Sequence, residues 1–197
     1  MARSPHTLAS ARLTLASAPA GSVWHHIFLD RFPDPLGFGF ASSRFSDPRK
    51  SPRFGVYYVG QTFEVAFLET IVRDRRNGNP GPLILSASDL DAYVHVLVTA
   101  AGALNLLDLR GGNAIAMGVP TNAVRASSHR LGQRASVAAH DRPERLDGIW
   151  YPSRLNDDEN LAIYGRSIGK LSAGPRRTLT TCPEMAPILN IYHVALV

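Results

Sequence analysis

Residues 44–74 read RFSDPRKSPRFGVYYVGQTFEVAFLETIVRD, and they predict an arginine-bearing loop, a short strand, a tight turn and an amphipathic helix. The run at 55–59 is rich in β-branched and aromatic residues and stops at Gly60, which is typical of a buried strand. Thr62 can cap a helix over residues 62–74 with its hydroxyl. We expect the rest of the chain to be organised around these elements.

Glu69 decides how this helix is interpreted. At about 100° per residue, its neighbours on the helix surface are Val65, Ala66, Val72 and Arg73. Most of them are apolar, so the carboxylate is expected at the edge of the buried stripe, where it is unfavourable unless something pairs with it or uses it. An exposed ion pair with Arg73, one helical turn on, explains the same pattern. Helix geometry alone leaves both interpretations open.

The composition is that of a globular domain. The chain has 197 residues, of which 45% are hydrophobic and 19% charged. We expect a tail or short helix over residues 1–21 and a single domain over 22–197. No apolar run approaches the roughly 18 residues of a membrane span. The one cysteine, Cys182, excludes an internal disulfide and fits a reducing compartment, so we expect a cytoplasmic protein.

The formal net charge of +5 favours an anionic ligand or an acidic partner. The basic residues are scattered, without aromatic interleaving or helix-turn-helix spacing, which argues against direct nucleic-acid binding. A non-catalytic basic module that binds an acidic protein or RNA is the alternative function from these features. His129 and His140 have no metal-ligand spacing with Cys, Asp or Glu, so we predict no metal site.

A long loop over residues 30–50 carries Arg44. Loops of this length inside a compact domain are usually functional. Phe45 is an apolar anchor beside the guanidinium, an arrangement suited to bidentate phosphate recognition. A simple ion pair with Asp47 is the other interpretation.

The pattern of apolar residues predicts the remaining elements. A strand over 23–28 would place His25 and His26 on opposite faces, where either could touch a ligand or be structural. The run 148–153 is an apolar strand that stops at a proline, and Ser153 just beyond it could offer its hydroxyl to a ligand or stabilise the turn. The other predicted elements are strands at 83–85, 93–99, 104–109, 161–164 and 191–196, a turn at 76–82, a helix at 122–139, and a loop at 154–160.

Three blocks of the sequence resemble the RES domain, a bacterial toxin family named for its Arg, Glu and Ser. They are DPLGFGFASSRFSDP, FGVYYVGQTFEVAFLET and DGIWYPSRLNDDENLAIY, in the expected order between residues 34 and 164. The resemblance makes Arg44 the family arginine, Tyr58 the tyrosine, Glu69 the glutamate and Ser153 the serine.

Two departures from the family pattern concern phosphate binding. An insertion at 47–53, DPRKSPR, lengthens the segment before Tyr58 and leaves Arg44 and Arg53 as alternatives for the pocket. His26 stands where related sequences often have an arginine, so Arg31 becomes a candidate for that phosphate contact.

The resemblance implies an α+β fold of mixed, mostly antiparallel sheets around an NAD-binding cleft with flanking helices, like that of ADP-ribosyltransferases. It also implies cleavage of the nicotinamide–ribose bond of NAD+, with transfer of ADP-ribose to a target protein, water or phosphate. The implied partner is an antitoxin with an Xre-like helix-turn-helix domain, encoded in the neighbouring gene.

The chemistry of that reaction gives each residue an expected role. Nicotinamide leaves as a neutral molecule, so a single carboxylate suffices where ordinary glycoside hydrolysis needs two. Glu69 would stabilise the oxocarbenium-like ribose, and Arg44 would hold the pyrophosphate. Tyr58 would support the ribose or pack against nicotinamide, and Ser153 would bind the substrate or orient the carboxylate.

Overall fold

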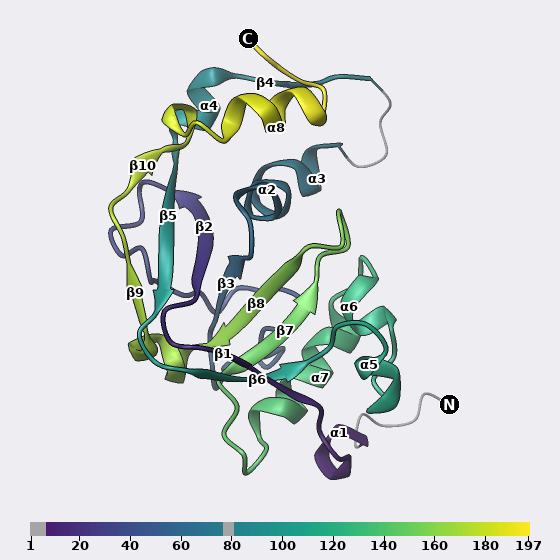
Figure 1. Ribbon diagram of the computed structural model, residues 1–197. Helices are drawn as coiled ribbons and strands as arrows, with labels where there is room; N and C mark the ends of the chain where they lie inside the picture. The colour runs from purple at the N-terminus through teal and green to yellow at the C-terminus, as the bar shows by residue number, and fades with distance from the viewer. Residues whose placement is uncertain (1–6, 77–80) are drawn as a thin grey trace.

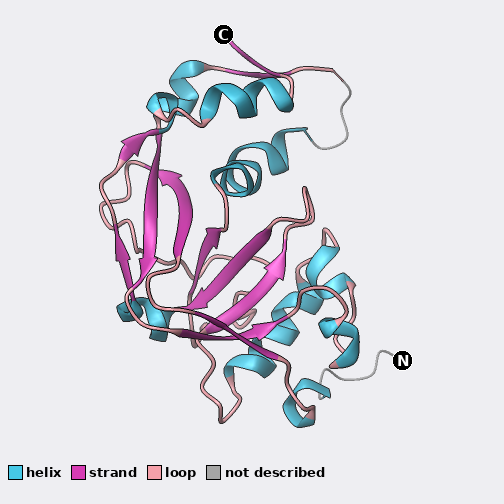
Figure 2. Ribbon diagram, viewed as in Figure 1, coloured by secondary structure: helices cyan, strands magenta, loops and turns pink. Residues whose placement is uncertain are grey.

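A computed structural model describes residues 7–76 and 81–197. These residues form an α+β fold in which a large curved sheet is flanked by helices (Figures 1 and 2). The predicted fold class, α+β with a mostly antiparallel sheet, is confirmed. The strand order is β1-β6-β7-β8-β3-β2-β5-β10, and β9 also pairs with β5. The strands of this sheet are β1 (Leu15–Ala18), β2 (Val23–Leu29), β3 (Val56–Gly60), β5 (Tyr93–Ala100), β6 (Leu104–Asp108), β7 (Gly148–Pro152), β8 (Glu159–Tyr164), β9 (Leu171–Ala173) and β10 (Arg177–Thr178).

The sheet divides into two halves between β3 and β2. These strands share a single residue pair, His25 with Gly60, whereas β3 and β8 pair along their whole length. A side chain at Gly60 would approach Val65 Cγ1 to 2.6 Å and Ala66 N to 2.9 Å. Glycine therefore lets the next helix turn off directly at the strand end, and the strands of the two halves diverge there (Figure 1).

The helix that follows β3 is α-helical at both ends and π-helical in the middle. Its parts are α2 (Phe63–Phe67), η1 (Leu68–Val72) and α3 (Arg73–Arg76). The predicted cap is confirmed, because Thr62 Oγ1 accepts a hydrogen bond from Val65 N at 3.1 Å. In the π-helical part the Arg73 N–H donates to the carbonyl of Leu68, five residues back. The wider turn contains Glu69, and such turns are frequent at functional sites.

Helices cover the sheet on two sides. The first group is α1 (Thr7–Ser10), α5 (Asn113–Ala116), α6 (Asn122–Arg125) and α7 (Arg130–His140), which share a core with β3, β6, β7 and β8. A second core joins α2 and η1 to β2, α4 (Ala87–Asp91), α8 (Met185–Ile191) and the small parallel pair β4 (Leu83–Leu85) and β11 (Val194–Leu196). A third core consists mainly of strand side chains and lies on the opposite face of the sheet, because its residues in β2, β3 and β8 alternate with those of the other two cores. Short 3₁₀ helices occur at η2 (Gly165–Lys170) and η3 (Leu179–Thr181).

Three sequence-based predictions differ from the structure. Residues 15–18, expected in a tail or short helix, form β1 because they pair antiparallel with β6 and bury Ala18. The helix expected over 122–139 is broken into α6 and α7, because Ala126 has an extended backbone. The strand expected over 191–196 is shorter, since α8 continues to Ile191 before β11 begins.

The turn predicted at 76–82 lies for the most part outside the described residues. Along the described ranges, 7–76 and 81–197, the helices are too short and too polar to cross a bilayer.

Candidate active site

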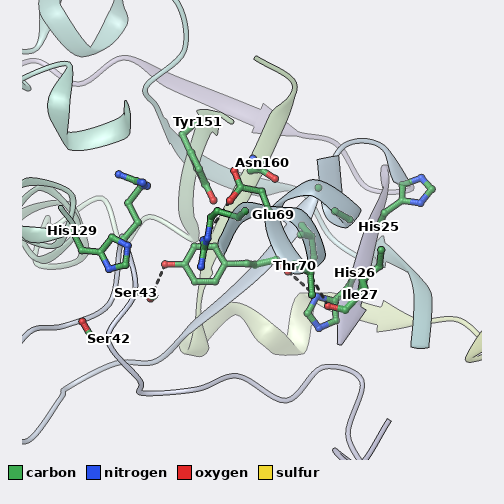
Figure 3. A pocket seen from close by; sticks show the side chains of 16 residues that line it. His25, His26, Ile27, Ser42, Ser43, Glu69, Thr70, His129, Tyr151 and Asn160 are labelled. Carbon is green, nitrogen blue, oxygen red and sulfur yellow. Dashed lines mark hydrogen bonds and ion pairs between the residues drawn. The ribbon is translucent and has the colours of Figure 1, made fainter. Parts of the chain in front are cut away.

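A cleft of about 340 Å³ opens where the two halves of the sheet separate (Figure 3). This volume falls within the range of small-molecule sites. The loop at 42–44, strands β2, β3, β7 and β8, helix η1 and the residue before α7 all contribute to its wall. The lining residues are His25, His26, Ile27, Ser42, Ser43, Arg44, Tyr58, Val59, Gly60, Ala66, Glu69, Thr70, Arg73, His129, Tyr151 and Asn160.

Glu69 lies in the cleft and is held by Ser153. The Ser153 hydroxyl donates to Glu69 Oε1 at 2.8 Å. Ser153 is completely buried, and its oxygen accepts a hydrogen bond from Leu155 N at 3.1 Å. The hydroxyl proton is therefore committed to the carboxylate. Of the two roles expected for Ser153, this geometry favours orientation of Glu69, because Ser153 itself does not line the cleft.

Glu69 was expected either at the edge of the buried stripe or in an exposed ion pair with Arg73, and each expectation describes part of its surroundings. Its side chain is 22% exposed, at the border between the buried stripe and the cleft. Oε2 also pairs with Arg73 Nη1 at 3.4 Å. Because Arg73 lines the same cleft, this ion pair belongs to the site rather than to a solvated helix face.

Arg44 is the loop arginine that reaches the cleft. Its Nη1 donates to the carbonyl of Ala126 at 2.7 Å, at the break between α6 and α7. Burial lowers the pKa of the Arg44 guanidinium from its usual value, but an arginine keeps its charge in a protein. Its backbone also packs against Gly132, where a Cβ would lie 2.5 Å from the Arg44 carbonyl oxygen. The guanidinium is thus a fixed cation in the cleft wall.

Arg53 and Arg31, the other two candidates for phosphate binding, do not line the cleft. Arg53 pairs with Asp141 at 2.8 Å and lies 3.6 Å from Asp47. The inserted segment folds back on itself, since Asp47 accepts from the backbone N–H groups of Arg49 and Arg53. Asp47 is therefore a partner of these arginines rather than of Arg44. Arg31 is exposed, with its guanidinium 5.2 Å from the centre of the Phe32 ring.

Tyr58 holds the loop that carries Arg44. Its hydroxyl accepts from Phe45 N at 3.0 Å and is hydrogen-bonded to Ser43 Oγ at 2.9 Å. Burial raises the pKa of Tyr58, so the hydroxyl stays protonated at neutral pH. Tyr57 points to the opposite face, as expected for strand neighbours, and donates to the carbonyl of Pro35 at 2.9 Å. Tyr58 therefore fixes the residues on both sides of Arg44.

The two histidines of β2 are neutral. His26 Nδ1 donates to the carbonyl of Tyr58 at 2.9 Å, and burial lowers the pKa of His26 to about 4. His25 Nδ1 lies 3.0 Å from His95 Nε2, and burial lowers the pKa of His95 to about 4. The cleft thus has the neutral imidazole of His26 at the position where related sequences often have an arginine.

Arg73, His129, Tyr151 and Asn160 also line the cleft, although the sequence patterns indicated no binding or catalytic role for them. Tyr151 and Asn160 lie opposite each other in the β7–β8 register, so they share a face of the sheet. Burial, with the Glu69 carboxylate nearby, raises the pKa of Tyr151 well above its usual value. The alternation of side chains along β7 and β8 could have indicated that Tyr151 and Asn160 face the cleft. Asn160, however, had been assigned to the loop before β8.

Arginine, glutamate and serine thus meet around one cleft in a mostly antiparallel α+β fold, and this combination defines a RES domain. The RES domain family model matches residues 17–181, and the chain belongs to this family.

Two known proteins illustrate the relationship. The chain is 36% identical over 129 residues to "Probable toxin y4kH" of Sinorhizobium fredii, a match that covers 64% of this chain and all of the relative. In fold it is similar to a chain of the M. tuberculosis MbcT-MbcA toxin-antitoxin complex. The TM-score is 0.62 at 16% identity, covering 83% of this chain and 86% of that one.

Proposed function

We propose that this chain is the toxin of a toxin–antitoxin pair and that it consumes NAD+ by breaking the nicotinamide–ribose bond. Membership of the RES family and the likeness to a probable toxin support the first part. The observation that carries the second part is the site: a carboxylate oriented by a buried serine shares one cleft with a half-buried guanidinium.

Different residues serve substrate binding and bond cleavage. Arg44 grips the pyrophosphate through charge-assisted hydrogen bonds, each worth about 1.5 to 3 kcal/mol. Glu69 stabilises the positive charge that develops on the ribose as nicotinamide departs. Because Ser153 and Arg73 fix both carboxylate oxygens, little reorganisation is needed during the reaction. Preorganised groups of this kind contribute roughly 3 to 4 kcal/mol to transition-state stabilisation.

The test is release of nicotinamide from NAD+ by the purified protein. Glu69→Gln keeps the shape of the side chain but removes the charge and replaces one acceptor oxygen by an amide donor, and we expect a loss of at least about a hundredfold in kcat. Glu144→Gln is the matched control, because Glu144 pairs with Arg142 and lies outside the cleft lining. Full activity of Glu69→Gln, with the fold intact by circular dichroism, would remove Glu69 from the mechanism.

Separating the products identifies the acceptor of ADP-ribose. Reactions with and without inorganic phosphate distinguish hydrolysis from phosphorolysis, and label incorporated into bacterial protein reveals transfer to a target. A wild-type protein that releases no nicotinamide but binds acidic protein or RNA in a strongly salt-dependent way would support the non-catalytic basic module instead.

We further propose that an antitoxin with a helix-turn-helix domain blocks the cleft and that the toxin acts in the cytoplasm. The first proposal is supported by the structural neighbour, which comes from a toxin-antitoxin complex. Co-expression with the product of the adjacent gene should give a stable complex that releases no nicotinamide. A complex with full activity would contradict the blocking role.

A further inference from the structure

One buried amide in the cleft lacks a hydrogen-bond partner within the part of the chain that the structure describes. Asn160 is only 4% exposed and lies in β8, opposite Tyr151 of β7 and Gly60 of β3. Its Nδ2 is fully buried and makes no hydrogen bond to any described residue. Buried donors in native proteins nearly always have an acceptor, so this exception calls for an explanation.

The unpaired donor belongs to the cleft face of the strand. Asn160 is one of the residues that line the cleft, together with Glu69 (Figure 3). The preceding residue, Glu159, faces the other side, where it accepts from Arg110 at 3.0 Å and from Trp150 Nε1 at 2.8 Å. Glu159 is thus fully paired on one face of β8, and Asn160 is incompletely paired on the face that meets the cleft. An acceptor supplied by a bound ligand would complete the pairing.

Because Glu69 and Asn160 line the same cleft, the chemistry of the two side chains restricts what a shared ligand group can be. Glu69 offers carboxylate oxygens, which accept hydrogen bonds, whereas Asn160 Nδ2 donates. A ligand group that satisfies both must donate and accept at the same oxygen. A hydroxyl does this, while a phosphate or carbonyl oxygen only accepts and an ammonium group only donates.

We infer that Asn160 is a positioning residue that donates to the 2′-hydroxyl of the nicotinamide ribose, the hydroxyl that in turn donates to Glu69. This hydroxyl is adjacent to the carbon whose bond breaks, and hydrogen bonds to it strengthen as glycosidic transition states form. The inference rests on the proposed function. Asn160 would turn the ribose so that its anomeric carbon faces the carboxylate.

The experiment compares two ligands that cannot be cleaved. One is an NAD+ analogue with a methylene group in place of the nicotinamide-ribose ring oxygen, and the other is its 2′-deoxy form. Their dissociation constants are measured by calorimetry for the wild type and for Asn160→Ala. Because one neutral hydrogen bond is lost, the preference for the hydroxyl form should fall about fivefold to tenfold in the variant. Asn113→Ala in α5, outside the cleft lining, should keep the wild-type preference.

Thermal unfolding separates this role from a structural one. Removing an unpaired buried amide should leave the midpoint unchanged or raise it. Asn160→Leu keeps the volume and serves as a second variant if the alanine form unfolds, and it should show the same loss of preference. An unchanged preference in a folded variant overturns the inference, even if nicotinamide release by the wild type upholds the proposed function. A wild type that neither cleaves NAD+ nor binds the analogues refutes the proposed function itself.

Discussion

Replacing Tyr58 by phenylalanine tests whether Arg44 is held in place through its loop. The substitution removes the acceptor of Phe45 N and the partner of Ser43 Oγ. Phe45 is completely buried, so its N–H would lose its partner away from solvent, which costs about 1 to 3 kcal/mol. The loop can then relax, and Arg44 loses its fixed position in the cleft.

We expect the KM for NAD+ to rise about tenfold in Tyr58→Phe, with kcat changed less than about threefold, because a charge-assisted contact worth roughly 1.5 to 3 kcal/mol is partly lost. Tyr57→Phe is the matched control: the same hydroxyl is removed from the neighbouring residue, where its partner is the Pro35 carbonyl. That variant should lose about 1 kcal/mol of stability and keep its KM.

A double-mutant cycle tests whether Tyr58 acts by holding the loop of Arg44 or by contacting the substrate directly. If Tyr58 acts through the loop, its replacement should change KM less than about twofold when Arg44 is already alanine. Fully additive effects of the two substitutions would refute the reasoning, because they would show that Tyr58 contributes independently of Arg44.

Three further predictions use the same structure. Ser153→Ala should lower kcat about tenfold to a hundredfold with KM nearly unchanged, because a hydrogen bond to a carboxylate is lost; equal losses in binding would contradict an orienting role. Gly132→Ala should lower the thermal midpoint and raise KM, since its Cβ would lie 2.5 Å from the Arg44 carbonyl oxygen, whereas Gly112→Ala, with open space around it, should do neither. The folded-state pKa of His26, about 4, lies below the unfolded value of 6.5, so its contribution to stability is complete above pH 6.5 and is lost as the pH falls toward 4. Between pH 7 and pH 5, His26 should account for about 2 kcal/mol of a total loss to which His95 also contributes, and His26→Gln should remove its share in denaturation measurements at the two pH values.

The strands and the capped helix could be predicted because their signals are local. Alternating apolar residues and turn formers surround β2, β3 and β5, and Thr62 directly precedes the helix that it caps. The break between α6 and α7 could not be predicted in this way. The Ala126 carbonyl at that break bonds to Arg44, which lies 82 residues earlier in the chain.

The candidate site was predictable in its residue types and less so in its geometry. The predicted position of Glu69 on the helix surface assumed 3.6 residues per turn. The π-helical turn that contains Glu69 has a different period, so the actual direction of the carboxylate could not be predicted. Whether Arg44 or Arg53 faces the cleft depended on how the inserted segment folds, which is settled by Asp47 and its backbone donors. Asn160 was missed because β8 begins at Glu159, earlier than its apolar run suggests.

The packing of η1 has a consequence for the cell that makes this protein. The helix that carries Glu69 shares its core with α8 and β11. The ribosome synthesises these two elements after all the residues that line the cleft. A nascent chain that has not yet released this segment lacks the apolar core that supports the helix of Glu69. On the proposed function, the cleft therefore matures only after α8 and β11 have left the ribosome, later than the synthesis of its own lining residues.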